Sequence, residues 1–170
     1  MFLGSSYNSF VSLSQEVDAQ YAVIESKLQR RFDLIPNLVE TVKGHMAHEA
    51  EVFGNIADAR ARMAGARTVD ERVAASNELE SAFSRLLVVM ENYPQLKAQE
   101  SVARLMDELA GAENRISVER DNYNAVVRQY NTRILSFPAV IMARMFGYSS
   151  RPYFQADPAA QQAPRVNLGN

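Results

Sequence analysis

Residues 95–136 read QLKAQESVARLMDELAGAENRISVERDNYNAVVRQYNTRILS and form the longest stretch of helical periodicity in this chain of 170 residues. Apolar side chains recur through it at a near-heptad spacing, which is typical of a helix that packs against a neighbour along its whole length. They are Val102, Leu105, Leu109, Ala112, Ile116, Tyr123, Val126, Tyr130, Ile134 and Phe137, with Glu119 as the one charged residue in the register. A helix of this length would span roughly 60 Å. The stretch therefore predicts an elongated helical protein.

A Tyr-Asn dipeptide occurs twice inside this stretch and once near the N-terminus. The copies are Tyr7-Asn8, Tyr123-Asn124 and Tyr130-Asn131. Because the last two copies lie seven residues apart, their tyrosines project from the same side of one helix. Asparagine favours caps and turns over helix interiors, so these asparagines indicate a specific hydrogen-bonding role. We expect the six residues to form a polar strip that bonds between helices; the alternative is a polar strip that binds a ligand.

Three prolines divide the helical pattern into segments. They are Pro36, Pro94 and Pro138. We expect a first amphipathic helix that ends near residues 29–32. Asp33 can then cap a second helix, with Pro36 in its first turn, where the missing N–H is not needed.

Local signals mark the later helices. Thr68-Val69-Asp70-Glu71 has the form of a capping box, so we expect the third helix to begin there. It should end or bend sharply at Tyr93, because the following proline restricts the backbone of that residue. After the long fourth helix comes a short apolar segment over residues 139–148, in which Gly147 is the expected stop.

These segments predict an all-α fold, an antiparallel four-helix bundle with long helices over residues 7–148. Residues 1–6 have the pattern of an apolar stub that continues into a polar linker, as expected if an apolar segment precedes them. Residues 149–170 are rich in Pro, Gln and Ala and have few branched apolar side chains, so we expect a mostly disordered tail.

Composition excludes several classes of function. The chain has 18 basic and 20 acidic side chains, so its charge favours no nucleic-acid partner, and it has no cysteine for disulfides or thiolate metal sites. The nearest approach to a membrane-spanning helix, residues 137–143, has about a third of the required length. No nucleophile is paired with a base, and no glycine-rich phosphate loop occurs. We therefore expect neither enzymatic activity nor a cofactor.

One cluster has the residue types of a metal site. His45, His48 and Glu49 would face one side of the second helix at spacings of three and four residues. The carboxylate-bridged metal bundles need Glu-x-x-His on two helices, and neither histidine has a glutamate three residues before it. We therefore expect a solvated or hydrogen-bonded face and no bound metal.

Short motifs follow one another in a characteristic order along the chain. They are Tyr7-Asn8 with Val11, Arg31 to Glu40 (RFDLIPNLVE), Val42-Lys43-Gly44, His48-Glu49, Ala59-Arg60, Glu91 to Pro94 (ENYP), Leu96-Lys97-Ala98, Glu113 to Ile116 (ENRI), Tyr123-Asn124, Tyr130-Asn131 and Phe137-Pro138. This order resembles the LemA family over residues 4–154, and the run from Arg31 to Val39 is its most specific part.

The resemblance implies a bacterial, four-helix domain that is held at the cell membrane by one N-terminal transmembrane helix. Residues 1–4 would then be the trailing end of that anchor, and the bundle would lie on the periplasmic or extracytoplasmic side. The family has no established enzymatic activity. His45 departs from the family pattern, which places an aromatic residue, commonly tyrosine, after the glycine, so the resemblance lends no support to a metal at His45.

We therefore expect a scaffold or adaptor that binds other membrane or envelope proteins. The candidate partner surface consists of polar residues that an amphipathic core does not require: Asp33, Asn37, Glu40, Lys43, His48 and Glu49. The structural alternative is that Asp33 caps a helix, Pro36 opens it and Gly44 permits close helix approach. Two other functions stay open: a bundle that binds a small ligand or metal, and a homo-oligomer that assembles through the long helices and residues 139–148.

Overall fold

A computed structural model describes residues 2–155, and over that range its only regular elements are helices. They are α1 (Phe2–Lys43), α2 (Ala50–Gly65), α3 (Val69–Met90), α4 (Pro94–Lys97), α5 (Glu100–Leu135) and α6 (Ala139–Met145). The prediction of an all-α fold with long antiparallel helices and a short C-terminal helix is confirmed.

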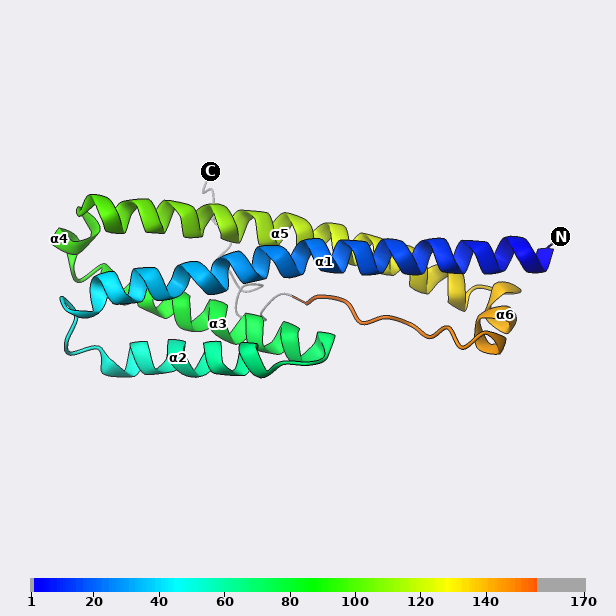
Figure 1. The fold of residues 1–170 in the computed structure, drawn as a ribbon, viewed down its shortest axis with the longest axis horizontal. Coiled ribbons are helices and arrows are strands. Elements are labelled where there is room, and N and C mark those ends of the chain that lie inside the picture. The colour runs from blue at the N-terminus through cyan, green and yellow to red at the C-terminus, as the bar shows by residue number, and fades with distance from the viewer. Residues whose placement is uncertain (1, 156–170) are drawn as a thin grey trace, which may run out of the picture.

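The molecule is built on α1 and α5, which lie side by side and antiparallel along most of their length (Figure 1). The helices α2 and α3 pack on each other as a second antiparallel pair. This pair covers only the half of the molecule where α1 ends and α5 begins, while α6 packs on α1 and α5 at the other end, near the N-terminus. The four-helix arrangement is therefore confined to one half of the long α1–α5 pair.

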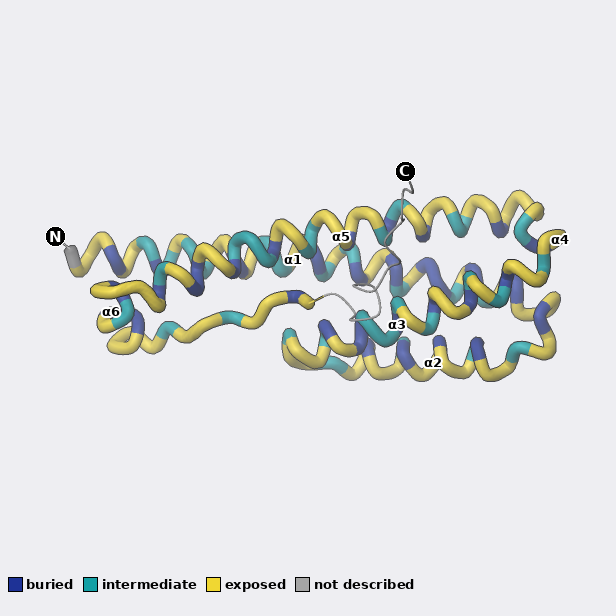
Figure 2. Tube along the Cα trace, turned by 180° about the vertical axis from the view of Figure 1, so that it is seen from behind, coloured by how far each residue is buried: buried dark blue, intermediate teal, exposed yellow. Residues whose placement is uncertain are grey.

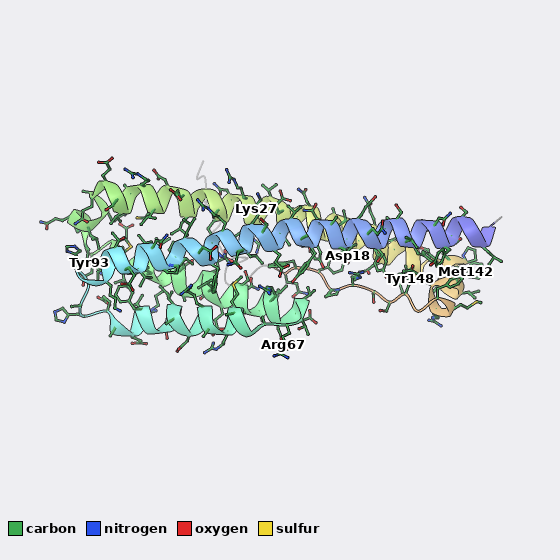
Figure 3. The ribbon with its side chains drawn as sticks, in the orientation of Figure 1. Asp18, Lys27, Arg67, Tyr93, Met142 and Tyr148 are labelled. Carbon is green, nitrogen blue, oxygen red and sulfur yellow. The ribbon has the colours of Figure 1, made fainter. Side chains whose placement is uncertain are left out.

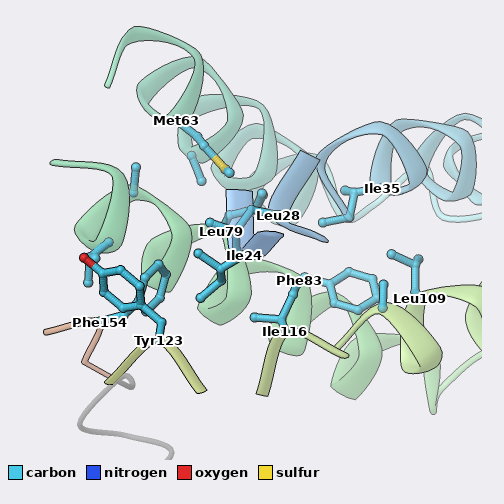
Figure 4. Close-up of a cluster of buried hydrophobic side chains, with 14 of the residues drawn as sticks. Ile24, Leu28, Ile35, Met63, Leu79, Phe83, Leu109, Ile116, Tyr123 and Phe154 are labelled. Atoms are coloured by element: carbon cyan, nitrogen blue, oxygen red, sulfur yellow. The ribbon is translucent and has the colours of Figure 1, made fainter. Parts of the chain in front are cut away.

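An apolar core joins the helices, and buried positions recur along one side of each long helix (Figure 2). Figure 4 shows the side chains that meet at its centre: Ile24, Leu28 and Ile35 of α1, Met63 of α2, Leu79 and Phe83 of α3, and Leu109, Ile116 and Tyr123 of α5. Most positions predicted from the heptad pattern are buried or packed against this core. Phe137 is the exception, with 82% of its surface exposed, because α5 ends at Leu135 and Phe137 leaves the helical register.

Helix α1 continues through Pro36. The predicted break at residues 29–32 and the predicted N-cap at Asp33 are therefore wrong. An internal proline lacks the N–H that would bond the carbonyl four residues earlier, and it costs about 3 kcal/mol or more. The neighbouring Ile35 and Leu38 are completely buried, and burying such side chains contributes about 1.5–3 kcal/mol each, so packing offsets the cost.

We predicted that the first helix ends before Pro36. It ends instead at Lys43, and residues 44–49 connect α1 to α2. The second helix accordingly begins at Ala50 and not near Asp33. Gly44 stands at this break, where its backbone freedom disfavours continuation of the helix. Met46 is buried and fixes the connection to the core.

Two predicted boundaries are confirmed. The Glu71 N–H donates to Thr68 Oγ1 at 3.1 Å and the Thr68 N–H donates to the Glu71 carboxylate at 3.4 Å, so α3 begins with the predicted capping box. Gly147 follows α6 with a φ of +78°, a conformation that glycine adopts without strain. The predicted fourth helix is divided, because residues 98–99 separate α4 from α5.

Both ends that were predicted to be non-helical or disordered are ordered where the structure describes them. Residues 2–6 form the first turns of α1, so the polar linker that we expected before the first helix is itself helical. Residues 149–155, hereafter the strap, run extended from the α6 end back along the bundle toward α3 (Figure 1). The prediction of a disordered tail is wrong for the strap; residue 1 and residues 156–170 lie outside the described residues.

Arg31 of α1 is completely buried, which is rare for a charged side chain. Its Nη1 donates to both carboxylate oxygens of Glu113 on α5, at 2.9 and 3.2 Å. Its Nη2 donates to the hydroxyl and the carbonyl of Ser76 on α3, at 2.6 and 3.1 Å. One guanidinium therefore ties three helices together.

Replacement of Arg31 by Ala should lower the free energy of unfolding by about 3–5 kcal/mol, because the buried Ser76 and the part-buried Glu113 lose their partner. Arg30→Ala is the matched control, since Arg30 makes an exposed pair with Glu108 at 3.2 Å, and it should cost at most about 1 kcal/mol. Urea denaturation followed by circular dichroism measures both. Equal losses in the two variants would contradict a central role for Arg31.

Candidate interaction surfaces

The Tyr-Asn copies on α5 bind the backbone of the strap. The amide of Asn131 accepts from the Arg151 N–H at 2.8 Å and donates to the Arg151 carbonyl at 3.0 Å. Asn124 makes the same pair of bonds with Phe154, at 2.8 and 2.9 Å. Each asparagine therefore satisfies both backbone groups of one extended residue, as a neighbouring strand would.

The tyrosines of the same dipeptides add one bond each. The hydroxyl of Tyr130 donates to the Ser149 carbonyl at 2.9 Å, and the hydroxyl of Tyr123 donates to the Pro152 carbonyl at 3.4 Å. Burial raises the pKa of Tyr123, against an opposing contribution from the nearby Arg151 charge, so its hydroxyl stays protonated and able to donate.

The seven-residue repeat on α5 has a geometric explanation. Seven residues of helix rise by roughly 10.5 Å, and three residues of extended chain advance by roughly 10 Å. Asn131 and Asn124 accordingly bind strap residues that are three apart, and so do Tyr130 and Tyr123. The repeat thus matches the register of a chain that runs antiparallel to α5.

Side chains from α1 and the core hold the strap from its other sides. Arg151 donates to Asp18 at 2.6 Å and to the Ser14 hydroxyl at 3.0 Å, on the stretch of α1 where Figure 3 labels Asp18. Burial lowers the pKa of Arg151, but the hydrogen bonds and charges of Asp18 and Tyr130 together outweigh this effect, so the pKa lies above its ordinary value. Phe154 fills the core beside Tyr123 with 1% of its surface exposed (Figure 4).

The predicted polar strip is thus only partly assembled. The hydrogen bonds of its four α5 residues join that helix to the strap and not to another helix, because the strap, which we predicted to be disordered, occupies that face. The N-terminal copy is separate. Asn8 is exposed, and the Tyr7 and Phe146 rings pack in a T-shaped arrangement with their centroids 5.0 Å apart. In the tail, the signal for order was Phe154, a large apolar side chain among prolines.

The predicted partner surface lies at the end of the bundle away from the N-terminus. Asp33, Asn37 and Glu40 share one exposed face of α1, and Lys43 is the exposed last residue of that helix. His48 and Glu49 lie in the α1–α2 connection, so the surface is formed by a helix end and a loop. The side chains of two members make hydrogen bonds within the protein. Asp33 accepts from Gln29 at 2.9 Å, and Glu49 accepts from the Tyr93 hydroxyl at 3.4 Å.

Among the hollows on the described surface, two bear on ligand binding, and neither was predicted from the sequence. One, of about 500 Å³, lies at the same end of the bundle, where Figure 3 labels Tyr93, and its lining is His45, Asn92, Tyr93, Pro94, Gln95, Leu96 and Gln99. The other, of about 570 Å³, lies between α1 and α5 and is lined by both signs of charge: Lys27, Arg30 and Arg115 face Asp107 and Glu108.

The metal candidates do not share a helix face. His45, His48 and Glu49 lie in the α1–α2 connection, which breaks the helix that we predicted there. Within residues 2–155, no three side chains among His, Asp and Glu come together as a metal site would require. None of the helices over that range combines the length and apolar character needed to cross a bilayer.

Replacement of Asn131 or Asn124 by Ala should each lower the free energy of unfolding by about 1–3 kcal/mol, since a backbone N–H and carbonyl of the strap lose their partners. Hydrogen exchange should show faster exchange at the Arg151 amide in Asn131→Ala and at the Phe154 amide in Asn124→Ala. Asn114→Ala, at an exposed position of the same helix, is the control and should leave both the stability and the strap amides essentially unchanged. Unaltered exchange in the first two variants would contradict the assigned role.

Comparison with known proteins agrees with the resemblance to the LemA family that the sequence motifs indicate. A model of the LemA family matches residues 20–168. The chain is similar to magnetosome protein MamQ 2 of Paramagnetospirillum magneticum strain AMB-1, with 27% identity over 90% of this chain and 66% of the relative. It is similar to magnetosome protein MamQ of Magnetospirillum gryphiswaldense, with 25% identity over the same shares. It also resembles protein LemA of Metamycoplasma hominis, with 22% identity over 88% of this chain and 68% of the relative.

The chain therefore spans about two thirds of the length of the magnetosome relatives that it matches, 66% in each case. The family match covers most of the chain, including all of α2 to α6 and the strap. This protein belongs to the LemA family.

Proposed function

We propose that the protein is a non-enzymatic, membrane-tethered scaffold or adaptor of the bacterial envelope that binds other envelope proteins. The observation that carries this proposal is the polar face of Asp33, Asn37 and Glu40, which stays exposed on a helix whose other face is deeply buried. None of the three is needed to fill the core. Such a face, next to a loop with two further polar side chains, suits a protein partner with complementary charges.

The names of two relatives support a location of this protein at a membrane. Both bear the name magnetosome protein, which places those proteins at a bacterial organelle. For this chain we propose a single N-terminal anchor in the cell membrane, with the bundle on the periplasmic or extracytoplasmic side. The candidate partner surface would then stand at the end of the bundle far from the anchor (Figure 1).

A second candidate function is the binding of a small polar ligand. The hollow beside His45 and Tyr93 favours it, because its lining combines an imidazole, a phenol and amide side chains near Glu49. Isothermal titration with candidate ligands against the protein and a His45→Ala variant separates this function from a scaffold, which needs no ligand there.

The test of the adaptor role reverses two exposed charges, with Glu40→Lys and Lys43→Glu in one variant. Recovery of the partner from detergent-solubilised membranes should fall by roughly tenfold or more, because like charges across an interface cost several kcal/mol. Quantitative mass spectrometry of the co-purified proteins measures it, and an unchanged melting curve shows that the fold is intact.

The matched control reverses two exposed charges in the middle of α5, with Arg115→Glu and Asp121→Lys, and also keeps the net charge. It should retain the proteins that the first variant loses. Equal recovery in the two variants would show that this surface does not bind the partner.

A further inference from the structure

Helix α6 is apolar on both of its faces. Ala139, Met142 and Ala143 are buried against α1 and α5. The opposite face carries Ile141 and Met145, with 53% and 71% of their surfaces exposed, and Phe137, two residues before the helix, is 82% exposed. A surface helix normally buries its apolar side chains and exposes polar ones, so Ile141 and Met145 on the outer face of α6 lack the cover that such side chains usually have.

The exposed apolar surface extends beyond α6. We define the end patch as Leu3, Leu135, Phe137, Ile141, Met145 and Phe146, all of which are about half exposed or more. The Phe146 ring contacts Tyr7 of α1, and Leu3 lies one helical turn before Tyr7. The patch therefore joins α6 to the start of α1, at the end of the molecule where the N-terminus lies (Figure 1). Apolar side chains gathered in this way mark an interaction site.

The charge of the same end has a single sign. Residues 2–15 contain no charged side chain, and residues 122–155 contain four arginines but no Asp, Glu or Lys. Arg151 is paired with Asp18. Arg144 is exposed on the outer face of α6, three residues after Ile141. The end patch is therefore apolar with one exposed arginine, Arg144, beside it, and its own segments supply no carboxylate.

From this combination we infer that the end patch sits on a bilayer that contains anionic lipids, with the outer face of α6 in the boundary between headgroups and acyl chains. Apolar and aromatic side chains lie at that depth, while arginines reach anionic headgroups. A second copy of the chain fits less well. A two-fold contact through this patch would place the Arg144 side chains of both copies together, with no carboxylate from either patch to neutralise them.

This inference deepens the proposed location at a membrane and rests on it, but it does not need the adaptor role. The test is flotation of the chain with two kinds of vesicle, phosphatidylcholine alone and phosphatidylcholine mixed with phosphatidylglycerol. The chain should float with the mixed vesicles and much less with the neutral ones. Added salt should weaken the difference, since it screens the arginines.

Two variants, each with a matched control, test whether the apolar side chains and the arginine of α6 bind the vesicles. Ile141→Ser with Met145→Ser should bind the mixed vesicles roughly tenfold less or worse, because two apolar side chains no longer enter the bilayer. Val88→Ser with Val118→Ser, at exposed positions of α3 and α5, makes the same chemical change elsewhere and should bind normally. Arg144→Gln should weaken binding to the mixed vesicles about fivefold, whereas Arg85→Gln on α3 should not.

The outcomes separate this inference from its rivals. No flotation with either vesicle, or equal flotation of the α6 variant and its control, would overturn it. Light scattering that shows a dimer, abolished by Ile141→Ser with Met145→Ser, together with no flotation, would assign the patch to self-assembly instead. The variant with Glu40→Lys and Lys43→Glu should float normally, so that loss of lipid binding and loss of partner binding are distinguishable.

Discussion

The buried guanidinium of Arg31 fixes the relative positions of α1, α3 and α5. Apolar packing alone tolerates small rotations and slides between helices, but bonds from Nη1 to both oxygens of Glu113 and from Nη2 to Ser76 require one alignment. Because a buried charge without partners is costly, helix arrangements that separate these groups are disfavoured. Arg31 lies one turn before Pro36, so the best-fixed part of α1 adjoins the point where its backbone is weakest. We infer that this anchorage helps the helix to continue through the proline.

The unequal lengths of the two helix pairs explain why an extended segment, the strap, is needed to cover part of α1 and α5. The α2–α3 pair is shorter than the α1–α5 pair, so half of the latter would expose apolar side chains. An extended chain can cover that half only if its backbone groups find partners, and α5 supplies them through the paired asparagines and tyrosines. Phe154 then provides the apolar contact. The strap thus takes the place that longer α2 and α3 helices would have occupied.

Patterns that depend on nearby residues were readable from the sequence. The heptad spacing of α5, the capping box at Thr68 and the stop at Gly147 were predicted because each rests on local periodicity or backbone preference. The continuity of α1 through Pro36 was not, because it depends on packing partners far away in the sequence. The strap was missed for a related reason: its order comes from asparagine amides on another segment, which composition cannot reveal. The polar strip was identified by its residues, but its binding partner was not.

The length of α1 separates the two ends of the molecule electrically as well as in space. Its 42 residues correspond to roughly 60 Å of unbroken helix. The range of electrostatic influence in physiological salt is about 8 Å, so the carboxylates around Asp33 and Glu40 are many screening lengths away from Arg144. A charge change at one end therefore leaves the field at the other end unaltered. The length of α1, together with screening by salt, therefore allows the charge of each end to change without an effect on the other end.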